Sequence, residues 1–240
     1  MARIIFDIET IGEDFEKMDK KTKEVLKEKV ERIVGDPKDK KAMKEGLVAE
    51  KEKFGLSPLT GEIVSIGMLD ADTKKGAVYF QAPDAEVEDF EEEGIKYKAM
   101  TEKEIIEGFW EVARHADEFV SFNGRPFDVP FILVRGAIHS IRPTKDLMSN
   151  RYLNVQKFGS KHIDLLDQLT FYGSVWNNKG SLHMWSRAFG IKSPKEEGVN
   201  GGDVAKLFKE KKYLEIAQYN ARDLYSTRDL FEYWDKFLRF

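Results

Sequence analysis

The sequence predicts an α/β protein, because segments with strand patterns are interspersed with segments of helical periodicity. Apolar, β-favouring segments occupy 2–10, 62–69, 77–80 and 118–122. Apolar residues at helical spacing mark 101–116 and 214–238. At 240 residues the chain can bury a substantial core, and we expect a single domain over residues 1–240.

The first strand carries two carboxylates. Asp7 and Glu9 are two residues apart, so their side chains would point to the same face, about 7 Å apart. Ile5 shares that face and the opposite face is apolar, a pattern typical of a central strand. Burial of two carboxylates is costly unless hydrogen bonds or a cation compensate for it. A hard divalent metal, which prefers carboxylate oxygens, would do so.

A stretch rich in Lys and Glu follows, roughly at 14–53. Its apolar residues recur at helical spacing, Gly35 would end a first helix, and Asp36 with Pro37 would begin a second. Acids and bases nearly balance, which favours a solvated helical hairpin inserted between two strands. A lid over the site is the alternative.

The strands at 62–69 and 77–80 would form an antiparallel meander with the first strand. The acidic run at 84–93 is interpreted as a solvated loop. Thr101 with Glu104 forms a capping-box pattern that predicts the beginning of the next helix.

The strand at 118–122 leads into Asn123-Gly124-Arg125-Pro126-Phe127-Asp128. The Asn-Gly pair and the prolines predict a tight turn and then a helix, with Asp128 near the helix N-terminus. A carboxylate at that place could serve only as a cap.

The stretch from 135 to 161 is basic. Its cations are Arg135, Arg142, Lys145, Arg151, Lys157 and Lys161, against the single acid Asp146. Tyr152 and Phe158 lie between them, and cations interleaved with aromatics suit a nucleic-acid single strand. The alternative is a solvated loop whose cations offset acids elsewhere.

Three further segments complete the chain. Asp164 and Asp167 are extra acids for which a cap or surface role is the simpler interpretation, and Ser181 would open a short helix. In the last helix Tyr219 and Asp223 are i, i+4 neighbours on one face. A pair at the surface is the alternative for that spacing.

Composition excludes several classes of function. There are no cysteines, so disulfides, thiolate zinc sites and cysteine nucleophiles are ruled out. The net charge of −4 means that nucleic-acid affinity would need a local basic patch. No apolar run approaches about 18 residues, so we expect a soluble, cytoplasmic protein without a membrane partner.

The three acidic segments occur in the order of a known family. Phe6-Asp7-Ile8-Glu9-Thr10, then Asn123 to Asp128, then Tyr219-x-x-x-Asp223 resemble the three exonuclease motifs of the DEDD superfamily. The first two look most like the proofreading domain of family-B DNA polymerases, and 58–67 and 164–167 resemble stand-alone exonucleases related to it. Position 218 holds Gln where a histidine subclass would have His, which indicates the tyrosine subclass, DEDDy.

The resemblance spans residue 1 to about residue 235. It implies a ribonuclease-H-like fold, with a mixed five-stranded sheet flanked by helices and a charged helical insertion after the first strand. It also implies metal-dependent 3′-to-5′ release of 5′-mononucleotides from single-stranded ends, with DNA expected rather than RNA. Two divalent cations, Mg²⁺ or Mn²⁺, would take part.

The resemblance also implies a role for each residue. Asp7 would bridge both metals, and Glu9 and Asp223 would hold the metal that activates water. Asp128 would act on the second metal through water, and Tyr219 would orient the nucleophile. The candidates for binding substrate are Asn123, which would line the terminal-nucleotide pocket, and Thr10, Phe127, Arg142, Lys145 and Arg151.

Two other functions remain open at this point. An exoribonuclease that trims RNA could use the same site, since discrimination of the 2′-OH depends on pocket shape. A catalytically silent binding module could keep the fold, but such proteins typically lose a metal ligand. No polymerase motif is present, so we expect no synthesis activity on this chain, and the sequence indicates no protein partner.

Overall fold

Strand β1 (Arg3–Gly12) is an interior strand, between β2 and β6, in the computed structural model, which describes residues 2–175, 180–192 and 201–239. The described residues form one seven-stranded sheet in the order β4-β5-β3-β2-β1-β6-β7. The other strands are β2 (Gly61–Asp70), β3 (Gly76–Phe80), β4 (Phe90–Glu92), β5 (Ile95–Ala99), β6 (Glu118–Ser121) and β7 (Lys161–Asp164). The central place predicted for the first strand is confirmed.

The sheet is mixed. β1, β2 and β3 form the predicted antiparallel meander, whereas β6 runs parallel to β1 and β7 parallel to β6. The prediction of five strands is wrong, because β4 and β5 add a hairpin at the far edge. Phe90 stacks on Tyr97 across this hairpin with ring centroids 4.7 Å apart, so part of the acidic run is a strand rather than a loop.

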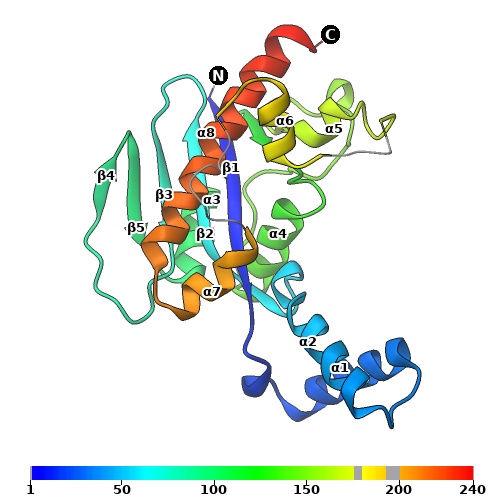
Figure 1. Cartoon of the computed structure of the whole chain (residues 1–240). Coiled ribbons are helices and arrows are strands. Elements are labelled where there is room, and N and C mark those ends of the chain that lie inside the picture. The colour runs from blue at the N-terminus through cyan, green and yellow to red at the C-terminus, as the bar shows by residue number, and fades with distance from the viewer. Residues whose placement is uncertain (1, 176–179, 193–200, 240) are drawn as a thin grey trace.

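Helices cover both faces of the sheet (Figure 1). α8 (Tyr213–Phe237) crosses one face, and α3 (Glu102–Arg114) and α4 (Asp128–Ile138) pack on the other. The shorter helices are α5 (Leu165–Leu169), α6 (Leu182–Ala188) and α7 (Val204–Lys209), with 3-10 turns at Leu153–Val155 and Gly201–Asp203. None of the described helices is long and apolar enough to cross a membrane.

The two faces of β1 enter different cores, as its alternation predicts. Ile4, Phe6 and Ile8 are buried with α3 and α4, while Ile5 is buried with α8. The acids of β1 therefore face α8. Gly67, which is paired with Asp7 across β1 and β2, lets α8 approach closely: a Cβ there would lie 2.7 Å from the Asn220 side chain.

The charged insertion is a helical hairpin, as predicted. Its helices are α1 (Lys20–Val34) and α2 (Lys40–Lys51), with 3-10 turns at Phe15–Lys17 and Phe54–Leu56. Gly35 ends α1 at a φ of 80°, but the second helix is capped by Asp39 instead of Asp36. Asp36 and Pro37 form the connecting turn. The hairpin extends away from the sheet, which favours the solvated hairpin over a lid (Figure 1).

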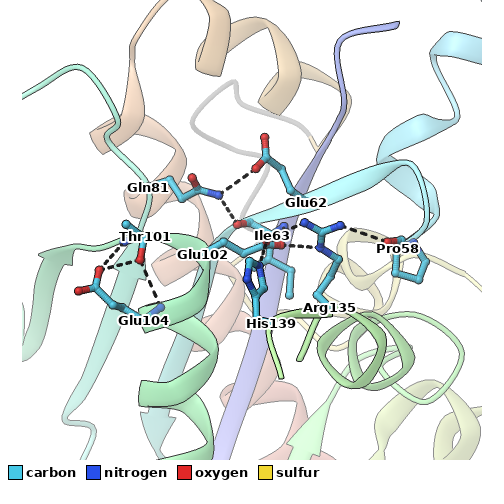
Figure 2. A network of polar contacts seen from close by, with 9 residues as sticks. All are labelled: Pro58, Glu62, Ile63, Gln81, Thr101, Glu102, Glu104, Arg135 and His139. Carbon is cyan, nitrogen blue, oxygen red and sulfur yellow. Dashed lines mark hydrogen bonds and ion pairs between the residues drawn. The ribbon is translucent and has the colours of Figure 1, made fainter. Parts of the chain in front are cut away.

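A buried carboxylate ties α3 to α4 and to β2 (Figure 2). Glu102 accepts hydrogen bonds from Arg135 Nε at 2.9 Å, His139 Nε2 at 2.6 Å and the Ile63 amide at 2.8 Å. Arg135 also donates to the Pro58 carbonyl at 3.4 Å. Because α4 begins at Asp128, this network fixes a candidate acid relative to the sheet.

This network predicts a stability effect. Glu102→Gln should lower the free energy of unfolding by roughly 3–5 kcal/mol, because removing one partner leaves the Arg135 charge buried and uncompensated. The exposed Glu107, whose carboxylate lies 3.9 Å from Lys103 Nζ, is the matched control: Glu107→Gln should change stability by less than about 0.5 kcal/mol. Urea unfolding measures both, and equal effects would contradict the assignment.

The same experiment has a defined pH dependence. Burial alone would raise the pKa of Glu102, but hydrogen bonds from Arg135, His139 and Ile63 outweigh it and hold the pKa below its usual 4.5. A lowered folded-state pKa stabilises the protein above pH 4.5 and loses that contribution as the pH falls through the folded pKa. The difference between wild type and Glu102→Gln should therefore be constant near neutrality and shrink in acid.

Candidate metal centre and active site

Three carboxylates from two elements meet over the middle of the sheet. Asp7 and Glu9 come from β1 and Asp223 from α8, and each offers an oxygen within 4.8 Å of the others. Glu9 and Asp223 are each only 8% exposed. A register shift between Glu9 and Thr10 marks an irregularity of β1 directly after the second acid.

Tyr219 lies one helical turn before Asp223 on the buried side of α8. Both side chains are buried, so the alternative of a pair at the surface is wrong. Burial, the nearby charges of Asp223, Glu9 and Asp7, and a hydrogen bond with Asp223 raise the pKa of Tyr219 far above its usual 10. The phenol is therefore protonated at neutral pH and is a hydrogen-bond donor, not a base.

Asp128 contacts β1 from α4, the helix that packs on the face of the sheet opposite α8. It is the first residue of α4, and its Oδ1 accepts a hydrogen bond from the Ile8 amide at 3.1 Å, so it does more than cap its own helix. It is 4% exposed. Burial raises its pKa to about 7, and the charges of Asp164 and Asp223 add to this, against the opposing effect of backbone amides. Asp128 is outside the group of carboxylates within 4.8 Å.

The hydrogen bonds of the acid group do not offset the effects of burial and of mutual repulsion on Asp7 and Glu9, whose pKa values are both raised. Burial, followed by Asp223 and Asp128, raises the pKa of Glu9, and no cation of the described residues opposes this. Burial and the charges of Asp128, Asp223 and Glu9 raise the pKa of Asp7 as well. A set of ionisable oxygens that repel one another fits a hard divalent cation, which would supply the missing charge.

Asp164 is a structural acid. It caps α5 by accepting from the Leu166 amide at 3.0 Å, in agreement with the simpler interpretation of its role. It also accepts from the amides of Asn123 at 2.9 Å and Arg125 at 3.0 Å, and so fixes the turn that leads to Asp128. Sequence reasoning missed this second role, because no spacing rule connects residues 123 and 164.

The basic stretch is partly neutralised within the protein. Arg151 pairs with Asp167 through its Nε at 2.8 Å, and Arg135 pairs with Glu102. Lys145 donates to the Gly159 carbonyl at 2.7 Å, whereas Arg142 is exposed. Two of the cations thus offset acids elsewhere, and a role in binding substrate stays a prediction for Arg142, Lys145 and Arg151.

The remaining candidates for binding substrate have structural contacts. The Thr10 hydroxyl donates to the Gly55 carbonyl at 2.6 Å, and the Phe127 ring packs on Phe131 with centroids 5.6 Å apart. Asn123 is exposed and has a φ of 66°. Their contact with substrate also stays a prediction.

Sequence reasoning missed two side chains beside the acids. The Asn220 amide donates to Asp7 Oδ2 at 2.7 Å, and the Ser65 hydroxyl donates to Asn220 Oδ1 at 3.0 Å. Asn220 directly follows Tyr219, so its place within the third motif could have marked it as a candidate site residue. Nothing in the sequence links Ser65 to either residue.

Comparison with known proteins places the chain. A family model described as "Predicted 3'-5' exonuclease related to the exonuclease domain of PolB" matches residues 62–237. That range contains Asp128, Tyr219 and Asp223, and the structure adds Asp7 and Glu9 from outside it. No curated protein matches the chain.

A solved structure shares the fold. The family B DNA polymerase from the hyperthermophilic archaeon Pyrobaculum calidifontis superimposes with a TM-score of 0.57 at 15% identity. The match covers 97% of this chain and 24% of the polymerase chain, so the chain spans about a quarter of that protein. The fold is accordingly α/β and ribonuclease-H-like, as the motif resemblance implied, with seven strands in the sheet.

The raised pKa of Asp128 predicts how the metal-free protein responds to pH. Its folded pKa of about 7 lies above the usual 3.8, so its favourable contribution is complete below pH 3.8 and is lost as the pH rises to about 7. Asp128→Asn should therefore become progressively more stable than wild type over this interval. Urea unfolding in chelator measures the difference.

A matched control is the exposed acid Asp89, whose carboxylate lies 3.9 Å from Lys98 Nζ. Asp89→Asn should follow wild type at every pH. A constant difference between Asp128→Asn and wild type would show that Asp128 does not titrate in this interval.

Proposed function

The chain belongs to the family of predicted 3′–5′ exonucleases related to the exonuclease domain of PolB, and we propose that it removes 5′-mononucleotides from single-stranded DNA. The reaction would be hydrolysis of the terminal phosphodiester at a free 3′ end. The observation that carries the proposal is the convergence of the half-buried Asp7 and the buried Glu9 with the buried Asp223 of α8, the helix that also carries Tyr219. A silent binding module would have no need to keep these repelling acids together.

The acids would hold two divalent cations, Mg²⁺ or Mn²⁺. Such a pair supplies an activated water and stabilises the leaving oxygen of an in-line displacement. Asp7 would be the shared ligand, with Glu9 and Asp223 as the other ligands of the cation on the water side. Asp128 would act on the second cation through water, in keeping with its place outside the 4.8 Å group.

Tyr219 would position the nucleophile. Its phenol is protonated, so it can orient the attacking water through a hydrogen bond but cannot remove the proton. The proton of the water would pass to solvent, because a cation lowers the pKa of a bound water to about 7.

The deciding experiment uses an end-labelled single strand with Mg²⁺ or Mn²⁺, and with chelator as the control. We expect stepwise shortening from the 3′ end, release of 5′-mononucleotides, and a block by a 3′-phosphate. DNA and RNA strands of one sequence test the expected preference for DNA. Cleavage of circular single strands at a comparable rate would refute an exonuclease.

Metal binding should be visible without nucleic acid. Mn²⁺ should raise the melting temperature of the wild type, because it binds only the folded acids. Asp7→Ala should abolish the rise and leave the metal-free protein as stable or slightly more stable, since a repulsion is relieved. The exposed Asp89→Ala is the control that should keep the rise. An undiminished rise in Asp7→Ala would remove Asp7 from the site.

Tyr219→Phe separates the hydroxyl from the ring. We expect the single-turnover rate to fall roughly ten- to a thousandfold, the scale for loss of one positioned hydrogen bond in a chemical step. The Mn²⁺ affinity of Tyr219→Phe should stay near that of the wild type, whereas Asp223→Ala should lose both Mn²⁺ affinity and cleavage. Tyr213→Phe, at another buried tyrosine of α8, is the control and should cleave normally. A wild-type rate in Tyr219→Phe would make Tyr219 a packing residue only.

A further inference from the structure

Asn220 is a fully buried amide next to the acid group. It is 0% exposed, and its amide nitrogen donates to Asp7 Oδ2 at 2.7 Å. Its oxygen accepts from the hydroxyl of Ser65, which is also 0% exposed, at 3.0 Å. Two hydrogen bonds thus run from β2 through α8 to β1.

The sheet leaves a place for this amide. Ser65 is paired with Glu9, and Gly67 with Asp7, across β1 and β2. Residues 65 and 67 share a face because they are two apart on a strand. A Cβ at Gly67 would lie 2.7 Å from Asn220 Oδ1, so the amide occupies space that a side chain at position 67 would take.

Only one orientation of the amide satisfies both neighbours. The Asp7 carboxylate can only accept when ionised, so the NH₂ end of Asn220 must face it. The oxygen end then faces Ser65, whose hydroxyl can donate to it. The reverse orientation would place two oxygens against each other and leave an amide N–H without its acceptor on Asp7.

A neutral donor suits this position better than a cation would. The charges of Asp128, Asp223 and Glu9 act on Asp7, and the Asn220 hydrogen bond is the contact that opposes them. Lys or Arg at this place would neutralise Asp7 and compete with a bound metal. An amide holds the carboxylate in one orientation and leaves its charge available.

We propose that Asn220 and Ser65 are positioning residues that preset the Asp7 carboxylate for metal binding, with Ser65 acting only through Asn220. The inference rests on the proposed metal-dependent function and adds two residues to it. Loss of such outer partners typically weakens metal affinity ten- to a hundredfold.

The mild variant is Ser65→Ala, which removes one hydroxyl from a buried strand. We expect the Mn²⁺ dissociation constant, measured by calorimetry without nucleic acid, to rise roughly tenfold. The single-turnover rate should fall at low Mn²⁺ and recover at saturating Mn²⁺. Ser226→Ala is the matched control, because the Ser226 hydroxyl is also buried and donates to the Lys192 carbonyl at 3.1 Å. It should bind Mn²⁺ like the wild type.

Asn220→Leu removes the donor while keeping a side chain of similar size. Its Mn²⁺ dissociation constant should rise by at least as much as that of Ser65→Ala. Adding Ser65→Ala to Asn220→Leu should then have no further effect on Mn²⁺ binding, because Ser65 would have nothing to orient. If the losses of Mn²⁺ affinity add in the double variant, Ser65 does not act through Asn220 and the proposal is refuted. If Asn220→Leu does not fold, Ser65→Ala and its control decide the question.

The outcomes separate this inference from the proposed function. If Ser65→Ala binds Mn²⁺ like the wild type and the wild-type protein cleaves normally, the positioning role of Ser65 is overturned and the exonuclease proposal stands. If Ser65→Ala binds Mn²⁺ more weakly but the wild-type protein cleaves no nucleic acid, the positioning role is supported and the exonuclease proposal is overturned. A wild-type protein that binds no Mn²⁺ would overturn both.

Discussion

Repulsion among buried carboxylates is the constraint that the rest of this structure has to satisfy. Asp7, Glu9 and Asp223 lie within reach of one ion, and Asp128 acts on them electrostatically from α4. Left to itself, such a group would separate. The backbone holds these acids in place: β1 is hydrogen-bonded to a strand on each side, and α8 packs closely over the neighbouring strand β2 at Gly67.

The buried acids of this protein fall into two chemical kinds. Glu102 and Asp164 are surrounded by donors, from Arg135 and His139 in one case and from three backbone amides in the other. Their negative charge is used to fix α4 and the turn before it. Asp7 and Glu9 have few donors, and burial, followed by the charges of neighbouring carboxylates, raises their pKa values. Acids with several donors fix the framework, whereas Asp7 and Glu9 belong to the candidate site.

Much of the frame could be predicted from local pattern. The alternation of β1 gave both of its faces, and the capping box at Thr101 gave the beginning of α3. The edge hairpin was missed because β4 and β5 are short, with three and five residues, and β5 pairs with β3 rather than with a strand predicted beside it. Asp36 with Pro37 predicts a helix start, whereas these residues form the turn and Asp39 caps the helix.

The acids that meet over the sheet could be selected from the sequence because they lie in motifs with fixed internal spacing. Their partners could not, since Ser65 and Asp164 act across strands distant in sequence. The pairing of Arg151 with Asp167, whose oxygen accepts from Arg151 Nε at 2.8 Å, was likewise not predicted. Pairing of this kind depends on the sheet order, which no local pattern fixes.

The helical insertion leaves and rejoins the sheet at one place. Gly12 is paired with Gly61, and the Glu13 amide donates to the Thr60 carbonyl at 2.8 Å. Without the insertion, β1 and β2 would be a plain hairpin closed at this point. The intervening chain can consequently be lengthened, shortened or exchanged over evolutionary time without changing the register that sets Asp7 opposite Gly67. The helical insertion can therefore vary independently of the acid group on β1.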